Sequence, residues 1–138
     1  MWELKRKEDY FIKRYHDENP GTLFLEAHVV FIERRSRARR IDGILIPGEE
    51  NIVYPQGTYS IEKLKESIQG KTIHLIESKQ ELGRYVIGQL VVGESLLYEV
   101  YKPEKVIMVV VCGKGNKDVE WYCNRNHIKV CIYPEMKN

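Results

Sequence analysis

The segment KTIHLIESKQ, residues 71–80, joins an apolar run to charged side chains. Glu77 and Lys79 are two positions apart, so on a strand they point to the same face of the sheet as Ile73 and Leu75. A carboxylate in such an apolar strand costs free energy unless it is paired or bound to a cation. The pattern therefore indicates a polar site at the end of a core strand.

A second carboxylate, Asp42, lies in the apolar run RIDGILI, residues 40–46. Strict alternation would place Asp42 on one face with Ile44 and Ile46. If this strand neighbours the strand that holds Glu77, the two acids lie opposite each other with Cβ atoms about 5 Å apart. The alternative for both acids is a structural ion pair with an arginine or a lysine.

Opposed carboxylates favour a cation between them, because like charges at that distance repel. Mg²⁺, or Mn²⁺ in its place, suits such a pair, since Mg²⁺ is commonly held by one or two carboxylates together with water and substrate phosphate. Lys79, two residues after Glu77, can orient or deprotonate an attacking water, or offset charge on a pentavalent phosphorus. Asp42, Glu77 and Lys79 together predict a metal site for phosphodiester hydrolysis. Taken alone, Lys79 is also compatible with an ordinary lysine at a strand end.

The elements that must position these residues alternate between helices and strands. Helical periodicity and capping signals predict helices over residues 2–18, 60–70, 80–101 and 118–126. Strand patterns predict strands over residues 22–33, 40–46, 72–78, 105–112 and 127–133, with residues 48–59 as a loop. The first two strands form a hairpin and helical crossovers add the last two. We therefore predict one α/β domain, residues 1–138, with a mixed central sheet flanked by helices.

The position of Asp42 in one strand and of Glu77-Ser78-Lys79 on the next resembles the D…ExK signature of the PD-(D/E)XK nuclease superfamily, which has the restriction-endonuclease-like fold. The αβββαβ core of that superfamily also matches the predicted order of elements over most of the chain. The resemblance implies that Asp42 and Glu77 bind magnesium, that the carbonyl of Ser78 adds a ligand, and that Lys79 serves catalysis. Isoleucine precedes Asp42 where the signature has proline, and the gap to Glu77 holds an additional helix.

The same resemblance implies a further acid and a glutamine near the site. Glu26, in the first strand, is the best match for the acid, and Glu3 and Glu8 are weaker candidates on the first helix. Gln89, on the helix after the lysine, resembles the glutamine that some families place at the edge of the site. The alternatives are a solvent-facing strand residue for Glu26 and a partly buried helix amide for Gln89.

Five arginines gather where the first predicted strand ends and the second begins. They are Arg34, Arg35, Arg37, Arg39 and Arg40. Such a run either contacts phosphates or forms the solvated tip of a hairpin. The formal net charge of the whole chain is only +2, so a polyanionic partner is favoured by this cluster rather than by the overall balance.

The three cysteines leave one unpaired in any disulfide scheme, which favours a reduced, cytoplasmic protein. Cys123, His127 and Cys131 are spaced four apart, but no CxxC pair is present, so core cysteines are a better interpretation than a zinc site. The first residues are charged throughout, unlike a secretory signal. No segment approaches the roughly 20 apolar residues of a membrane span.

Together these features predict a Mg²⁺- or Mn²⁺-dependent nuclease that acts on nucleic acid, with DNA favoured. Cleavage of both strands of a duplex by a domain of this size would need a homodimer. Three alternatives stay open. One is an inactive nucleic-acid-binding domain, and another is a nuclease subunit of a larger repair, transposition or defence complex. The third is a structural or interaction protein with a chance signature.

Overall fold

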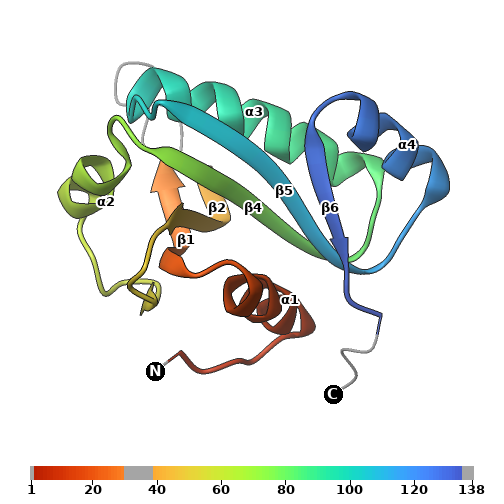
Figure 1. Cartoon of the computed structure of the whole chain (residues 1–138), viewed down its shortest axis with the longest axis horizontal. Coiled ribbons are helices and arrows are strands. Elements are labelled where there is room, and N and C mark those ends of the chain that lie inside the picture. Colours follow the sequence, from red (N-terminus) through yellow and green to blue (C-terminus); the bar gives the residue numbers. More distant parts are fainter. Residues whose placement is uncertain (1, 30–38, 135–138) are drawn as a thin grey trace.

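The computed structural model describes residues 2–29 and 39–134, in which a six-stranded sheet is flanked by helices (Figure 1). The strands are β1 (Gly21–Val29), β2 (Arg39–Pro47), β3 (Ile52–Tyr54), β4 (Thr72–Glu81), β5 (Lys105–Lys114) and β6 (Ile128–Ile132). Their order is β3-β1-β2-β4-β5-β6. β2 is antiparallel to both of its neighbours, and the other pairs are parallel. The predicted α/β class with a mixed central sheet is confirmed.

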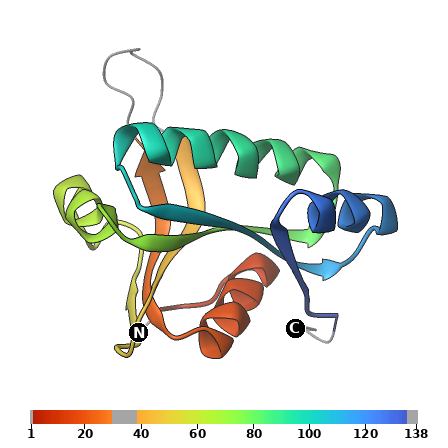
Figure 2. The same ribbon diagram turned by 45° about the horizontal axis from the view of Figure 1, so that its top comes forward.

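The described helices cover the two faces of the sheet differently. They are α1 (Lys7–Glu18), α2 (Ile61–Ile68), α3 (Arg84–Val100) and α4 (Lys117–Arg125). Figure 2 shows α1 on one side of the sheet and α3 on the other. One core therefore lies beneath α1, and a second core beneath α3 also takes in buried residues of α2 and α4. None of the described helices combines the length and the apolar character needed to cross a membrane.

Two boundaries differ from the predicted ones because of pairing between distant strands. β3 lies in the segment predicted as a loop, and its three residues pair in parallel with residues 22–24 of β1. β4 continues to Glu81, where Lys114 of β5 is its partner, so α3 begins at Arg84 rather than at Gln80. Local sequence patterns do not signal such tertiary contacts.

Helix α1 begins at Lys7, five residues later than predicted. The carboxylate of Asp9 accepts hydrogen bonds from the backbone N–H groups of Lys5 and Arg6, at 3.0 and 3.1 Å, and so caps the first turn. Residues 2–6 consequently form a non-helical arm that leads into α1.

Polar contacts fix α1 against β4. The hydroxyl of Tyr15, which is fully buried, lies 2.7 Å from Nδ1 of His74. At the other end of α1, Oγ of Ser78 donates a hydrogen bond to the carbonyl oxygen of Glu8 at 2.8 Å. The first turn of α1 is thereby held beside the residue that follows Glu77.

Candidate active site

Asp42 and Glu77 are brought together by the pairing of β2 with β4, as the sequence predicts. The register pairs Gly43 with Ile76, so the next position places Asp42 opposite Glu77. The ladder ends there, and Oδ2 of Asp42 accepts a hydrogen bond from the backbone N–H of Ser78 at 2.9 Å. Glu77 is only 2% exposed, so its carboxylate is almost closed off from solvent, whereas Asp42 is partly exposed.

The pair is short of positive charge. Burial raises the pKa of Glu77 to about 9, and the charge of Asp42 adds to the rise, while Lys79 acts weakly in the opposite direction. At neutral pH Glu77 therefore keeps its proton as long as no cation is bound beside it. A cation in place of that proton would allow both groups to ionise.

Without a metal, the free energy of unfolding is expected to fall as the pH rises from about 4.5 to about 9. Across this window folded Glu77 holds a proton that the unfolded chain has lost, because its pKa is raised from 4.5 to about 9 on folding. This contribution to stability is complete below the lower pKa and is lost as the pH approaches the upper one. Urea unfolding in EDTA across this pH range measures the slope. Glu77→Gln, which is neutral at every pH, should flatten it, and an unchanged slope would contradict the assignment.

Strict alternation along β2 does not hold at Asp42. Ile41 lies in the core beneath α3, whereas Gly43, two residues on, faces the core beneath α1. The prediction that Asp42 shares a face with the isoleucines that follow it was therefore wrong. Ile44 belongs to the core beneath α3, while Asp42 lines a hollow on the α1 side together with Ile12. This irregular backbone brings the carboxylate to a surface that is open beside α1.

Strand β1 is irregular at the same level. Glu26 has a φ of +52°, a left-handed conformation that costs a non-glycine residue about 1–3 kcal/mol. Its neighbours Leu25 and Ala27 consequently pack on opposite faces of the sheet, although they are two residues apart. The carboxylate of Glu26 thereby lines the same hollow as Asp42. Its pKa is raised, first by burial and then by the charge of Asp42.

Glu26 therefore lies where the resemblance implies a further acid, beside Asp42. The two weaker candidates, Glu3 and Glu8, lie elsewhere. Glu3 is exposed and lines the outer part of the hollow. Glu8 contributes its backbone carbonyl to Ser78. Any catalytic role of Glu26 stays a prediction.

Two guanidinium groups hold Glu26. Arg6 Nη2 lies 3.3 Å from its Oε1, and Arg40 Nε lies 3.4 Å from its Oε2. Arg6 was not among the predicted site residues, and its only sequence signal was its place three residues before the capping Asp9.

The predicted role of the other arginines in phosphate binding is not tested by the described residues. Arg34, Arg35 and Arg37 lie outside the described residues, and the side chain of Arg39 is not described.

Lys79 lies on the face of β4 that packs against α3. Its Nζ is 5.3 Å from the centroid of the Tyr85 ring, a cation–π contact. The ammonium also lowers the pKa of Glu77 by its charge, which places the two side chains near each other. Tyr85 was not predicted as a site residue. Its spacing of four residues from Gln89 on one helix was the available signal.

Gln89 lies one helical turn from both Tyr85 and Gly93 on α3. Two contacts fix how α3 lies along β4. A Cβ atom on Gly93 would lie 3.3 Å from Cδ2 of Leu75, and two helical turns earlier the Tyr85 ring contacts Lys79. Gln89 is therefore at the level of Glu77, midway between these contacts. Its buried Oε1 accepts no hydrogen bond from any described residue, so it is available to a donor at the site.

The cysteines do not form a metal site in the described residues. Cys112 and Cys123 are buried in the core beneath α3, whereas Cys131 packs against the core on the opposite face. His127 is exposed. Cys112 and Cys123 are buried, as expected for core cysteines, and Cys131 is partly buried.

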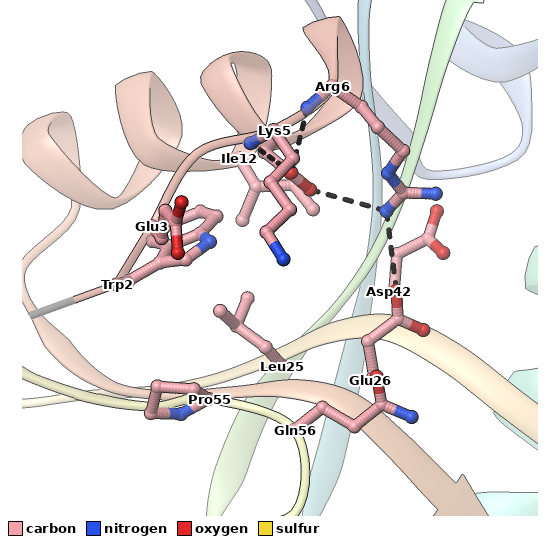
Figure 3. A pocket seen from close by; sticks show the side chains of 11 residues that line it. Trp2, Glu3, Lys5, Arg6, Ile12, Leu25, Glu26, Asp42, Pro55 and Gln56 are labelled. Atoms are coloured by element: carbon pink, nitrogen blue, oxygen red, sulfur yellow. Dashed lines mark hydrogen bonds and ion pairs between the residues drawn. The ribbon is translucent and has the colours of Figure 1, made fainter.

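An open hollow of about 450 Å³ leads from Asp42 and Glu26 along the arm that precedes α1 (Figure 3). We call it the arm pocket. Its lining residues come from the arm and α1, from β1 and β2, and from the turn after β3: Trp2, Glu3, Lys5, Arg6, Asp9, Ile12, Leu25, Glu26, Asp42, Pro55 and Gln56. The carboxylate of Asp42 is thus accessible from one side through a defined opening.

The donor set at this position fits a hard divalent cation. Asp42 and Glu77 are opposed carboxylates, and Mg²⁺ commonly uses one or two carboxylates with water and substrate oxygens. Within residues 2–29 and 39–134, no three His, Cys, Asp or Glu side chains are arranged to hold a metal by themselves. The carbonyl of Ser78 stays the predicted backbone ligand.

Comparison of the chain with protein-family models, with curated proteins and with solved structures gave no match in any of the three. The functional conclusion consequently depends on the chemistry of the site.

Proposed function

We propose that the chain is a Mg²⁺- or Mn²⁺-dependent nuclease that hydrolyses phosphodiester bonds, with DNA as its favoured substrate. The observation that carries the proposal is the opposition of Asp42 and the buried Glu77 where the β2–β4 ladder ends, with Lys79 near Glu77 on β4. A structural ion pair does not account for this arrangement, because each acid faces another acid. Lys79 offsets only part of the charge.

A restriction-endonuclease-like core is part of the proposal. The elements α1, β1, β2, β4, α3 and β5 follow the αβββαβ order, and the extra β3 and α2 are inserted between β2 and β4. The acids lie where the pairing of β2 with β4 ends. The site therefore lies between the two central strands of the sheet, and the arm pocket opens onto Asp42.

Asp42 and Glu77 would hold the metal ion, together with the carbonyl of Ser78. The bound ion would supply Lewis-acid polarisation of the phosphate and a more acidic water. Lys79 orients the attacking water and offsets the negative charge that develops on the phosphorus. The Lys79 ammonium also contacts the Tyr85 ring, and the Oε1 of Gln89, which has no partner among the described residues, accepts a hydrogen bond from water. Water oxygen bonds to phosphorus as the ester oxygen leaves with a proton.

The proposal also includes the cellular compartment and the oligomeric state. Cys112, Cys123 and Cys131 are all unpaired, which suits the reducing cytoplasm. One site per chain cuts one strand, so cleavage of both strands of a duplex would require a homodimer.

A cleavage panel tests the proposed function. Duplex, branched and single-stranded DNA and single-stranded RNA are incubated with Mg²⁺, Mn²⁺ or EDTA, using the wild type and Asp42→Asn side by side. We expect cleavage of DNA with either metal, none in EDTA and none by the variant. Binding without cleavage under any condition would favour an inactive nucleic-acid-binding domain instead.

The arginine run is expected to bind phosphates without regard to sequence. Replacing Arg37, Arg39 and Arg40 with alanine should weaken DNA binding equally for different sequences and flatten its salt dependence. Each lost phosphate contact should reduce the log–log slope by about 0.9 for duplex DNA. Fluorescence anisotropy across a salt series measures both. An unchanged affinity and slope would assign the run to a solvated hairpin tip.

A further inference from the structure

The arm pocket has the dimensions of a small-molecule site beside the acids. Its volume of about 450 Å³ lies within the range of about 300–1,000 Å³ that is usual for such sites. A single nucleobase fits a space of this size, and a base of a continuous duplex can enter such a side pocket only after it leaves the stack. A strand that enters the pocket is therefore unpaired at that nucleotide.

The outer end of the pocket is suited to a flat aromatic ring. The Trp2 indole and the Pro55 ring line one end of the pocket, and Leu25 lies from there toward Glu26 and Asp42 (Figure 3). Base–aromatic stacking is tolerant of sequence because every base has a π face. Beside this apolar part, the Glu3 carboxylate and the Gln56 amide can form hydrogen bonds with the edge of an unpaired base.

The two cationic residues of the arm, Lys5 and Arg6, differ in their contacts. Arg6 is engaged by Asp9 at 3.2 Å and by Glu26 at 3.3 Å. The Lys5 ammonium makes no ion pair with another side chain in the described part of the chain, and it lines the same pocket. It can therefore meet the phosphate next to a base held by Trp2.

We infer that the arm pocket binds one unpaired nucleobase next to the scissile phosphate, which makes single strands and frayed ends the substrates rather than continuous duplex. The inference rests on the proposed function, because it places the scissile phosphate at Asp42. It adds Trp2 as a residue that determines specificity, with stacking on the indole as its means.

Fluorescence of Trp2 tests the inference without turnover. The chain has two tryptophans, and Trp121 is 63% exposed on α4, away from the pocket. A Trp121→Phe background leaves Trp2 as the only reporter. Calcium replaces magnesium during titration with a single-stranded oligodeoxynucleotide, the same oligomer with abasic residues, an oligoribonucleotide, and a duplex whose two ends are closed by hairpins.

We expect single-stranded DNA to quench Trp2 saturably, and abasic residues to weaken binding by about 5- to 150-fold, the equivalent of one base–aromatic stack. The closed duplex should bind at least as weakly as the abasic strand. Equal quenching by the closed duplex or the abasic strand, or no quenching, would overturn the inference. Comparable quenching by RNA would extend the ligand to unpaired nucleotides of either sugar and would support base recognition.

Cleavage assays with Trp2→Phe and Trp2→Ala supply the second readout. Phenylalanine should keep the preference for single strands, and alanine should lose it while the protein keeps its circular dichroism spectrum. Quenching without cleavage of any substrate overturns the proposed catalysis and supports base binding. Cleavage with no base-dependent quenching overturns the inference alone.

Discussion

Replacing Lys79 with alanine is expected to lower the rate of DNA cleavage by at least about a hundredfold, a typical effect for a positioned acid–base or electrostatic group. The ammonium lies beside Glu77 and over the Tyr85 ring, but it has no oxygen with which to hold a metal. Substrate affinity in calcium should therefore stay within a few-fold of the wild type. Single-turnover cleavage and anisotropy measure the two quantities separately.

Lys114→Ala is the matched control for this variant. Lys114 also lies near the end of a strand, on the neighbouring β5, but it pairs with Glu81 at the surface, at 3.7 Å. Its replacement should leave cleavage unchanged. If Lys79→Ala cleaves at the wild-type rate, the signature is coincidental, and an inactive domain becomes the better description.

Glu77→Gln is expected to abolish cleavage while it stabilises the metal-free protein at alkaline pH. Glutamine has nearly the same shape as protonated glutamic acid, so it keeps the hydrogen bond to Asp42 and avoids ionisation of a buried group. It cannot supply the second charge that a divalent cation requires. Urea unfolding above neutral pH, in EDTA and then in magnesium, should show a more stable protein that no longer responds to the metal.

The combination of greater stability and lost activity separates a metal ligand from a residue that only supports the fold. Glu81→Gln provides the comparison, because Glu81 is exposed four residues further along β4. Cleavage and metal response should survive in that variant. A Glu77→Gln protein that remains active would remove Glu77 from the proposed site.

Periodicity and capping signals are strong enough to predict the sheet class and the neighbouring positions of Asp42 and Glu77. A strand of apolar residues and a long amphipathic helix each leave a local pattern. β3 leaves none, since its three residues become a strand only through pairing with β1. The late starts of α1 and α3 likewise depend on the Asp9 cap and on the partner of Glu81.

The face of the sheet on which Asp42 lies could not be predicted, because the alternation of side chains assumes a regular strand. The break depends on the left-handed backbone at Glu26, which is not a glycine, and on the matching irregularity between Ile41 and Gly43 in β2. Arg6 and Tyr85 were missed for a related reason. Each reaches the site through a tertiary contact, with Glu26 in one case and with Lys79 in the other.

The central claim is that Asp42 and Glu77 jointly bind a divalent cation, and a metal titration of thermal stability tests it most directly. Crowded carboxylates repel or retain a proton without metal, so millimolar Mg²⁺ or Mn²⁺ should raise the melting temperature of the wild type, with a larger rise at pH values where less of the proton must be displaced. Asp42→Asn should lose most of that rise. An equal rise in Asp42→Asn and in the wild type would place the metal elsewhere and contradict the account.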